Sequence, residues 1–241
     1  MTQGTNALGQ AIGPALDDWV PPPAPLRAVI IGRHCRLEPL QADRHASHLY
    51  EANALDAKGR NWTYLSYGPS GELAGFRAWI DASCQSDDPL YFAIVPRATG
   101  RAAGVASYLR VAPAGGSIEV GHINFSPLLA RTREATAAMH LMMKHAFALG
   151  YRRYEWKCDA LNAPSRVAAQ RLGFSFEGIF RQATVYKGRS RNTAWYSVID
   201  QEWPALDRAF AAWLDESNFD AAGRQRLRLS ALTAPLLKQR G

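Results

Sequence analysis

The feature that most constrains the fold is a long amphipathic helix expected at residues 132–149, with short strands on both sides of it. Gly150, a residue type that readily ends a helix, follows directly. A shorter helix is expected at 164–172, ended by Gly173. Alternating or apolar runs predict strands at 91–95, 104–111, 117–125, 153–158, 178–186 and 193–200. The first three form an antiparallel meander that leads into the long helix.

The flanking segments suggest one main domain with two extensions. Residues 1–33 are predicted to form an arm with a stiff linker at Pro21–Pro25, because consecutive prolines favour extended backbone. Residues 34–203 form the predicted domain, which opens with a strand at 34–40. Residues 204–241 are expected to form a helical extension. Within the domain, helices are expected at 43–54, capped by Asp43, and at 72–83, with a loop at 57–71 between them.

Composition excludes some protein classes and leaves others open. Lys and Arg outnumber Asp and Glu by 28 to 21, and this surplus suits a nucleic acid, an anionic surface, a phosphorylated ligand or only a solvated surface. The three cysteines are widely spaced, which predicts neither a disulfide scaffold nor a metal site. No export signal or apolar stretch long enough for a membrane span is apparent, so a cytoplasmic location without membrane contact is expected.

Three segments occur in a characteristic order: Glu119-Val120-Gly121-His122-Ile123, Ala135-Thr136-Ala137-Ala138, and Asn162-Ala163-Pro164-Ser165 followed by Gly173-Phe174. Together they resemble the GCN5-related N-acetyltransferase (GNAT) family over residues 34–200, closest to the branch with ribosomal-protein N-terminal acetyltransferases. The resemblance implies an α/β acyl-CoA N-acyltransferase fold, with a mixed, mainly antiparallel, splayed sheet flanked by helices. It also implies an enzyme that uses acetyl-CoA as co-substrate, needs no metal, and acetylates a primary amine by direct attack in a ternary complex.

The resemblance places the cofactor diphosphate at the start of the long helix, where free backbone N–H groups and the helix dipole suit an anion. The family's Gln or Arg, Gly, and Gly or Ala correspond to Ala130, Arg133 and Ala135, so the central glycine is missing. The expected cofactor-binding residues are Ile123, Asn124 and Phe125 in the strand, Arg131, Thr132, Arg133, Glu134, Ala135 and Thr136 at the helix start, and Asn162 and Arg166 beyond it.

Catalysis needs a neutral amine and a proton for the leaving thiolate. Glu119 and His122 are the candidate bases, and a paired strand glutamate and a packed strand histidine are the alternatives for them. Backbone N–H groups near His122 and Ile123 would stabilise the oxyanion. Many family members carry a tyrosine where this chain has Ala169, so Ser165 is the candidate proton donor, with a helix-start serine as the alternative.

Two other functions stay open at this stage. The chain could bind coenzyme A without catalysis, as a sensor or partner module, or it could bind nucleic acid through its basic surface, although the partner expected is an amine acceptor and not a nucleic acid. For an enzyme, the acceptor could be a protein N-terminus or a small-molecule amine, and a homodimer is possible.

Overall fold

The computed structural model describes residues 4–241, and a mixed sheet runs through its centre. The order of the strands in this eight-stranded sheet is β3-β4-β5-β6-β7-β8-β10-β9. All neighbours are antiparallel except β7 and β8, which are parallel. The strands are β3 (Ile30–Ile31), β4 (Cys35–Pro39), β5 (Leu90–Pro96), β6 (Gly104–Ala112), β7 (Ser117–Phe125), β8 (Arg153–Asp159), β9 (Ser175–Tyr186) and β10 (Arg189–Ile199).

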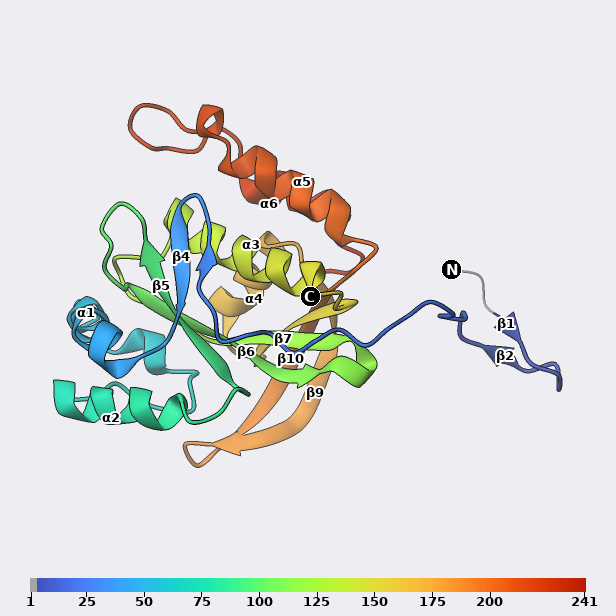
Figure 1. Ribbon diagram of the computed structural model, residues 1–241, viewed down its shortest axis with the longest axis horizontal. Coiled ribbons are helices and arrows are strands. Elements are labelled where there is room, and N and C mark those ends of the chain that lie inside the picture. The colour runs from blue at the N-terminus through green and yellow to red at the C-terminus, as the bar shows by residue number, and fades with distance from the viewer. Residues whose placement is uncertain (1–3) are drawn as a thin grey trace.

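Helices cover both faces of this sheet, as Figure 1 shows. On one face, α1 (Ala42–Ala54) and α2 (Leu73–Ser83) pack on β4, β5 and β6 around a core of their own. On the other face, α3 (Arg133–Ala148) and α4 (Ala163–Arg171) cover the larger core, which includes Tyr108, Tyr154 and Phe174. The fold class predicted from the sequence is therefore confirmed.

The C-terminal extension lies over α3, on the side away from the sheet (Figure 1). It contains α5 (Trp203–Leu214) and α6 (Leu229–Thr233). The His140 ring packs on Phe210 at 4.8 Å between ring centroids, and its Nε2 lies 2.6 Å from Asp207 Oδ1. These contacts fix the extension against the middle of α3.

Most predicted elements are present, with small corrections at their ends. The long helix begins at Arg133 after its cap Thr132, and Gly150 follows its end with a φ of 97°. The helix expected from residue 43 begins at Ala42, and its N-cap is Gln41 instead of Asp43. Gln41 keeps extended backbone, so the cap lies two residues earlier than the side-chain pattern indicated.

The segment predicted as an arm supplies one strand of the sheet, near the C-terminal end of that segment. β3 pairs with β4 through Ile30 and Ile31, so the sheet begins ahead of residue 34. Further back, β1 (Gly4–Thr5) and β2 (Ala11–Ile12) form a small hairpin that projects away from the body (Figure 1). None of the helices within residues 4–241 is long and apolar enough to span a membrane.

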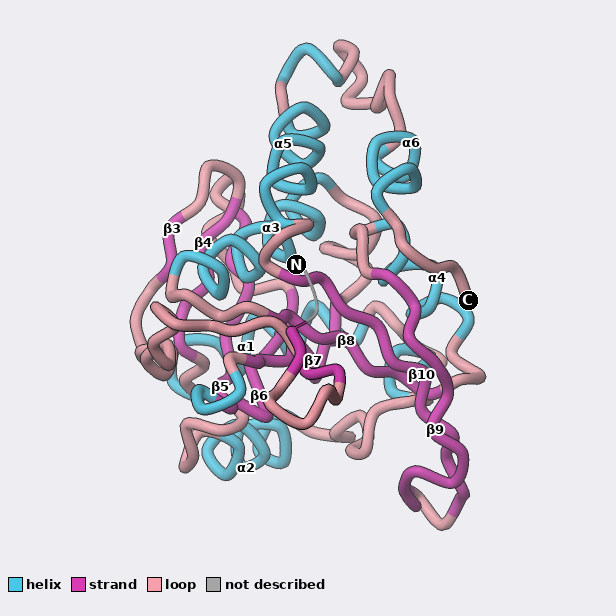
Figure 2. Tube along the Cα trace, turned by 90° about the vertical axis from the view of Figure 1, so that its right-hand side faces the viewer, coloured by secondary structure: helices cyan, strands magenta, loops and turns pink. Residues whose placement is uncertain are grey.

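Four one-turn 3₁₀ helices lie in the connections, at Arg60–Trp62, Pro113–Gly115, Glu216–Asn218 and Ala234–Leu236. The first lies in the loop predicted at 57–71, which touches two separate parts of the sheet. Asn61 Nδ2 donates to the Phe125 carbonyl at 2.8 Å, and Lys187 in the β9–β10 turn donates to the Trp62 carbonyl at 2.7 Å. The loop therefore joins the end of β7 to the long β9–β10 hairpin seen in Figure 2.

Candidate functional site

The two parallel strands at the centre of the sheet diverge. β7 and β8 pair only from Ser117 with Arg153 to Val120 with Trp156. Beyond that point, β7 stays bonded to β6, and β8 stays bonded to β10. The edge of residues 121–125 that faces β8 therefore has unpaired backbone groups beside an opening in the sheet.

A buried polar atom without a partner lies in this diverging part of β7. Asn124 is 4% exposed, and its Oδ1 has no hydrogen-bond partner among residues 4–241. A buried acceptor without a protein donor is costly, so it needs a partner from outside the chain, such as a water or a ligand. This orphan fits the amide-rich arm of coenzyme A, and it belongs to a residue that the sequence placed at the cofactor.

The start of α3 is a helix N-terminus capped by Thr132. Thr132 Oγ1 accepts from the Ala135 amide at 3.1 Å and donates to the Leu129 carbonyl at 2.7 Å. This cap uses one first-turn amide and leaves the amides of Arg133 and Glu134 for a ligand. Arg131 takes the left-handed conformation, with a φ of 64°. Arg133, which stands where the family has its central glycine, is the first helical residue of α3.

The side chain of Arg133 contacts the C-terminal extension. Its guanidinium lies over the Phe219 ring, 4.8 Å from the centroid. Thr136, another predicted phosphate contact, is 4% exposed, and its Oγ1 accepts from Arg171 Nη1 at 3.2 Å. Arg171 was not singled out in the sequence, because only the fold brings the end of α4 to the start of α3.

His122 lies where β7 changes its pairing with β6. Gly121 pairs with Ser107 and Asn124 with Val105, so β7 has one extra residue in a β-bulge. His122 itself is left-handed, with a φ of 48°, and its ring lies 5.0 Å from the Tyr91 ring. Burial, with the nearby Arg110 charge, lowers the pKa of His122 to about 4. The imidazole is therefore neutral at pH 7.

Glu119 belongs to a row of charged side chains on the sheet face that lacks α3 and α4. Arg110 Nη1 lies 2.8 Å from both of its carboxylate oxygens, and Lys157 Nζ lies 2.9 Å from Oε2. Lys157 also contacts Glu155 at 2.8 Å. Burial raises the pKa of Glu119, although these two cations act in the opposite direction. Both carboxylate oxygens thus already have cationic partners.

Ser165 is placed by a tryptophan. Its Oγ lies 3.0 Å from Trp156 Nε1, which is donor-only, so the serine oxygen accepts this bond and keeps its own proton free to donate. The same hydroxyl lies beside the buried Cys158, whose pKa is raised by burial despite this contact. Trp156 is the last β8 residue that pairs with β7, so Ser165 lies at the point of divergence.

The two remaining cofactor candidates make contacts within the fold. Asn162 is the N-cap of α4, and its Oδ1 accepts from the Ser165 amide at 3.1 Å. Arg166 donates to the Tyr196 hydroxyl at 3.2 Å and to the Ala160 carbonyl at 3.1 Å. Arg166 thus bonds to β10 and to the end of β8, and not to the start of α3.

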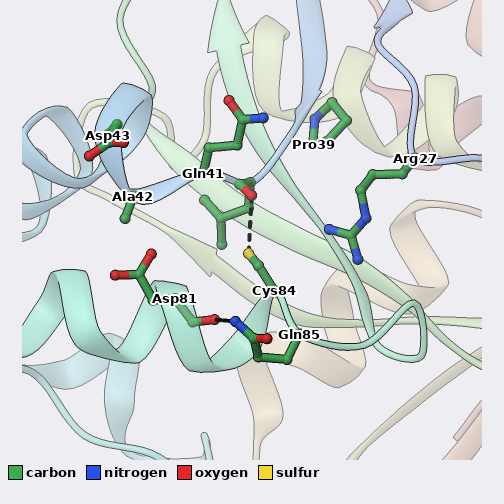
Figure 3. A pocket seen from close by; sticks show the side chains of 9 residues that line it. Arg27, Pro39, Gln41, Ala42, Asp43, Asp81, Cys84 and Gln85 are labelled. Carbon is green, nitrogen blue, oxygen red and sulfur yellow. Dashed lines mark hydrogen bonds between the residues drawn. The ribbon is translucent and has the colours of Figure 1, made fainter.

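A separate hollow of about 460 Å³ opens between the start of α1 and the end of α2 (Figure 3). Arg27, Asp43 and Asp81 line it, and Cys84 Sγ donates to the Leu40 carbonyl at 3.0 Å inside it. None of the candidate catalytic or cofactor-binding residues lines this hollow, so we do not include it in the site.

Comparison with known proteins agrees with this geometry. Residues 34–175 match the model of the acetyltransferase (GNAT) domain family. A GCN5-related N-acetyltransferase structure from Brucella melitensis is 47% identical, with a TM-score of 0.88, covering 91% of this chain and 100% of that one. A GNAT-family structure from Chromobacterium violaceum is 42% identical, with a TM-score of 0.74, covering 80% and 96%. No curated protein matches the chain.

A more distant structure shares the fold. It is the ribosomal α-N-protein acetyltransferase RimL in complex with coenzyme A, with 19% identity and a TM-score of 0.60, covering 71% of this chain and 98% of that one.

The fold and the family match define an acyltransferase. The chain belongs to the GNAT acetyltransferase family, as its sequence motifs indicated.

Proposed function

We propose that this acetyltransferase moves an acetyl group from acetyl-CoA to a primary amine, in a ternary complex without a covalent enzyme intermediate. The observation that carries the proposal is the divergence of β7 and β8 beside the capped start of α3. Amides of the first α3 turn would hold the diphosphate, and Asn124 with the free edge of β7 would bond the pantetheine arm. When bound, the cofactor supplies the activated acetyl thioester.

The bulge in β7 supports an oxyanion site at this place. A bulge leaves backbone outside the regular ladder, and here neither His122 nor Ile123 has a partner in the register of β7 with β6. Such an unpaired N–H is already fixed in direction before the reaction, which is the property that stabilises a developing oxyanion.

We assign the base to His122 instead of Glu119. Neutral His122 has a nitrogen lone pair at pH 7, whereas both Glu119 oxygens bond to Arg110 or Lys157. The acceptor nitrogen attacks with its lone pair, the C–N bond forms, and its surplus proton passes to His122 Nε2. The C–S bond then breaks, and the thiolate takes a proton from the Ser165 hydroxyl, which solvent replenishes.

The pKa of His122 restricts the acceptor. A base with a pKa of about 4 cannot hold an ammonium ion deprotonated, so the reaction depends on the fraction of acceptor that is already neutral. At pH 7 that fraction is about one tenth for an α-amino group of pKa ~8, and below about one thousandth for a lysine of pKa ~10.4. We therefore favour an α-amino group, on a protein N-terminus or a small molecule.

A binding and transfer assay tests this function. We expect millimolar acetyl-CoA to raise the melting temperature, since a ligand that binds only the native state stabilises it. We also expect release of free thiol with peptides or amino acids that carry a free α-amine. The matched control is each acceptor with its α-amine already acetylated. No thiol release with any amine, despite binding, would contradict catalysis.

The Ser165→Ala variant tests the proton donor. A hydrogen bond to a charged group is worth about 1.5–3 kcal/mol, so we expect kcat to fall about 10- to 100-fold. The Kd for acetyl-CoA should change little, because this bond forms as the thiolate develops. Stopped-flow kinetics and calorimetry measure the two quantities. An unchanged kcat would remove Ser165 from the mechanism and leave the fold assignment intact.

A further inference from the structure

Ser107 in β6 contacts the proposed base directly. Its Oγ lies 2.8 Å from His122 Nδ1 and 3.3 Å from the Gly121 carbonyl oxygen. Ser107 is fully buried, and the family motifs do not include it. The bulge and the left-handed backbone of His122 turn the imidazole toward this serine. Bulges beside functional sites commonly re-aim a side chain in this way.

Counting protons decides the direction of these two bonds. Ser107 has a single hydroxyl proton, and the Gly121 carbonyl can only accept. If the hydroxyl donated to Nδ1, the carbonyl would receive nothing from this hydroxyl, and only one bond of the hydroxyl would form. If Nδ1 carries the imidazole proton, it donates to Ser107 Oγ, which in turn donates to the Gly121 carbonyl. Two bonds then form in a chain, and each bond polarises the other.

We propose that Ser107 is a positioning residue that holds His122 in the tautomer with its proton on Nδ1, so that Nε2 presents its lone pair to the acceptor amine. The inference rests on the proposed function for its catalytic meaning, but the tautomer itself does not. In a neutral histidine, the bond made by one ring nitrogen determines the role of the other. Without Ser107, the ring can carry its proton on Nε2 and cannot act as a base there.

Several groups face this imidazole and bear on its titration. Arg110 comes from β6, and Asp88 from the turn before β5. The ring of Tyr91 in β5 lies 5.0 Å from the His122 ring, measured between centroids. The ring of Tyr67, in the loop between α1 and α2, lies 6.4 Å away. Asp88 is itself held by the Arg110 and Val111 amides, at 2.8 and 3.0 Å. These groups act on the pKa of the ring, whereas only Ser107 is within bonding distance of Nδ1 among the contacts of residues 4–241.

Nitrogen NMR of the wild-type protein tests the tautomer without any acceptor. The protein is labelled with ¹⁵N-histidine, and the ring signals of His122 are identified among its six histidines by their loss in His122→Asn. We expect a protonated Nδ1 and an unprotonated Nε2 at pH 7. A protonated Nε2 in the wild type would overturn the proposal. The readout is taken on the wild-type protein, and thermal unfolding of His122→Asn shows that the variant used for the assignment is folded.

Kinetics of Ser107→Ala then test the catalytic consequence, with Ser175→Ala, another buried serine, as the control. We expect kcat to fall about tenfold or more, a part of the 10²–10⁴-fold effect typical of a general base. The KM for the acceptor should change little, and the His122 spectrum should show loss of the fixed Nδ1–H form. A normal kcat in Ser107→Ala would overturn the positioning role. If no amine is acetylated but Nδ1 is protonated, the function fails and the tautomer stands.

Discussion

The His122→Asn variant is expected to lose about 10²-fold in kcat, the lower end of the range that a positioned general base contributes, because a base with a pKa of about 4 is weak at neutral pH. Asparagine is chosen because it tolerates left-handed backbone, and His122 has a φ of 48°. The bulge and its unpaired amide should therefore survive, while the base is lost. Steady-state thiol release under saturating acetyl-CoA measures the effect, and thermal unfolding shows that the variant is folded.

The pH dependence separates the base from the acceptor. Because burial lowers the pKa of His122 to about 4, the imidazole remains unprotonated through the neutral range. The decline of kcat/KM below about pH 8 should then follow protonation of an α-amino acceptor, and it should persist in His122→Asn at a lower level. The matched control is His48→Asn, which lies on α1 and should keep full activity. A wild-type kcat in His122→Asn would return the role of base to Glu119.

The same low pKa has a consequence for stability. An unfolded histidine has a pKa of about 6.5, so on acidification the unfolded chain takes up this proton before the native state does. His122 therefore adds no pH dependence to the free energy of unfolding above about pH 6.5. As the pH falls from there toward about 4, the unfolded chain gains the proton first, and the free energy of unfolding decreases. Burial of neutral His122 thus makes the native state less stable in acid.

Sequence periodicity predicted the helices and strands that bury one clear face. The 132–149 pattern places Ala138, Met142 and Ala146 against the sheet, and all three are fully buried. The alternation at 153–158 correctly separated Tyr154, Trp156 and Cys158 from the charged residues between them. The two-residue strand β3 was not predicted, because a segment that short contains less than one useful period.

The contacts that define the site could not be predicted in the same way. Ser107 and His122 are separated by 15 residues, and their contact depends on a bulge, which leaves no periodic signal. Arg171 meets Thr136 across 35 residues, because α4 packs back toward the start of α3. The alternation in β8 indicated on which face of the sheet Lys157 lies. Only the structure shows that its ion-pair partners are Glu119 in β7 and Glu155 in the same strand.

The Lys157→Met variant is expected to lose about 3–5 kcal/mol in the free energy of unfolding at pH 7, the usual cost of removing one partner from a buried ion pair. The Lys157 side chain is 9% exposed, and its Nζ lies within 2.9 Å of Glu119 Oε2 and Glu155 Oε2. It also lies over the Trp195 ring, 3.7 Å from the centroid. Methionine fills a similar volume but leaves both carboxylates without this cation. Urea unfolding measures the loss.

The loss should depend on pH with a definite sign. Burial already raises the pKa of Glu119 with Lys157 present, and removing that cation raises the pKa further. A native carboxyl with a raised pKa binds its proton before the unfolded one does, at about 4.3. The loss in the free energy of unfolding is therefore complete above the raised pKa of Glu119. It becomes smaller as the pH falls from that pKa toward about 4.3. A deficit that does not change with pH would contradict this origin.

A second substitution isolates the charge from the packing. Adding Glu119→Gln to Lys157→Met removes the buried charge that lost one of its two cationic partners. The other partner, Arg110, has a side chain that is 61% exposed and remains solvated. We expect the double variant to recover most of the loss, so that the two changes are strongly non-additive. The exposed Lys144→Met on α3 is the control and should stay within about 0.5 kcal/mol of the wild type. Additive losses would mean that Lys157 acts through its packing on Trp195 and not through Glu119.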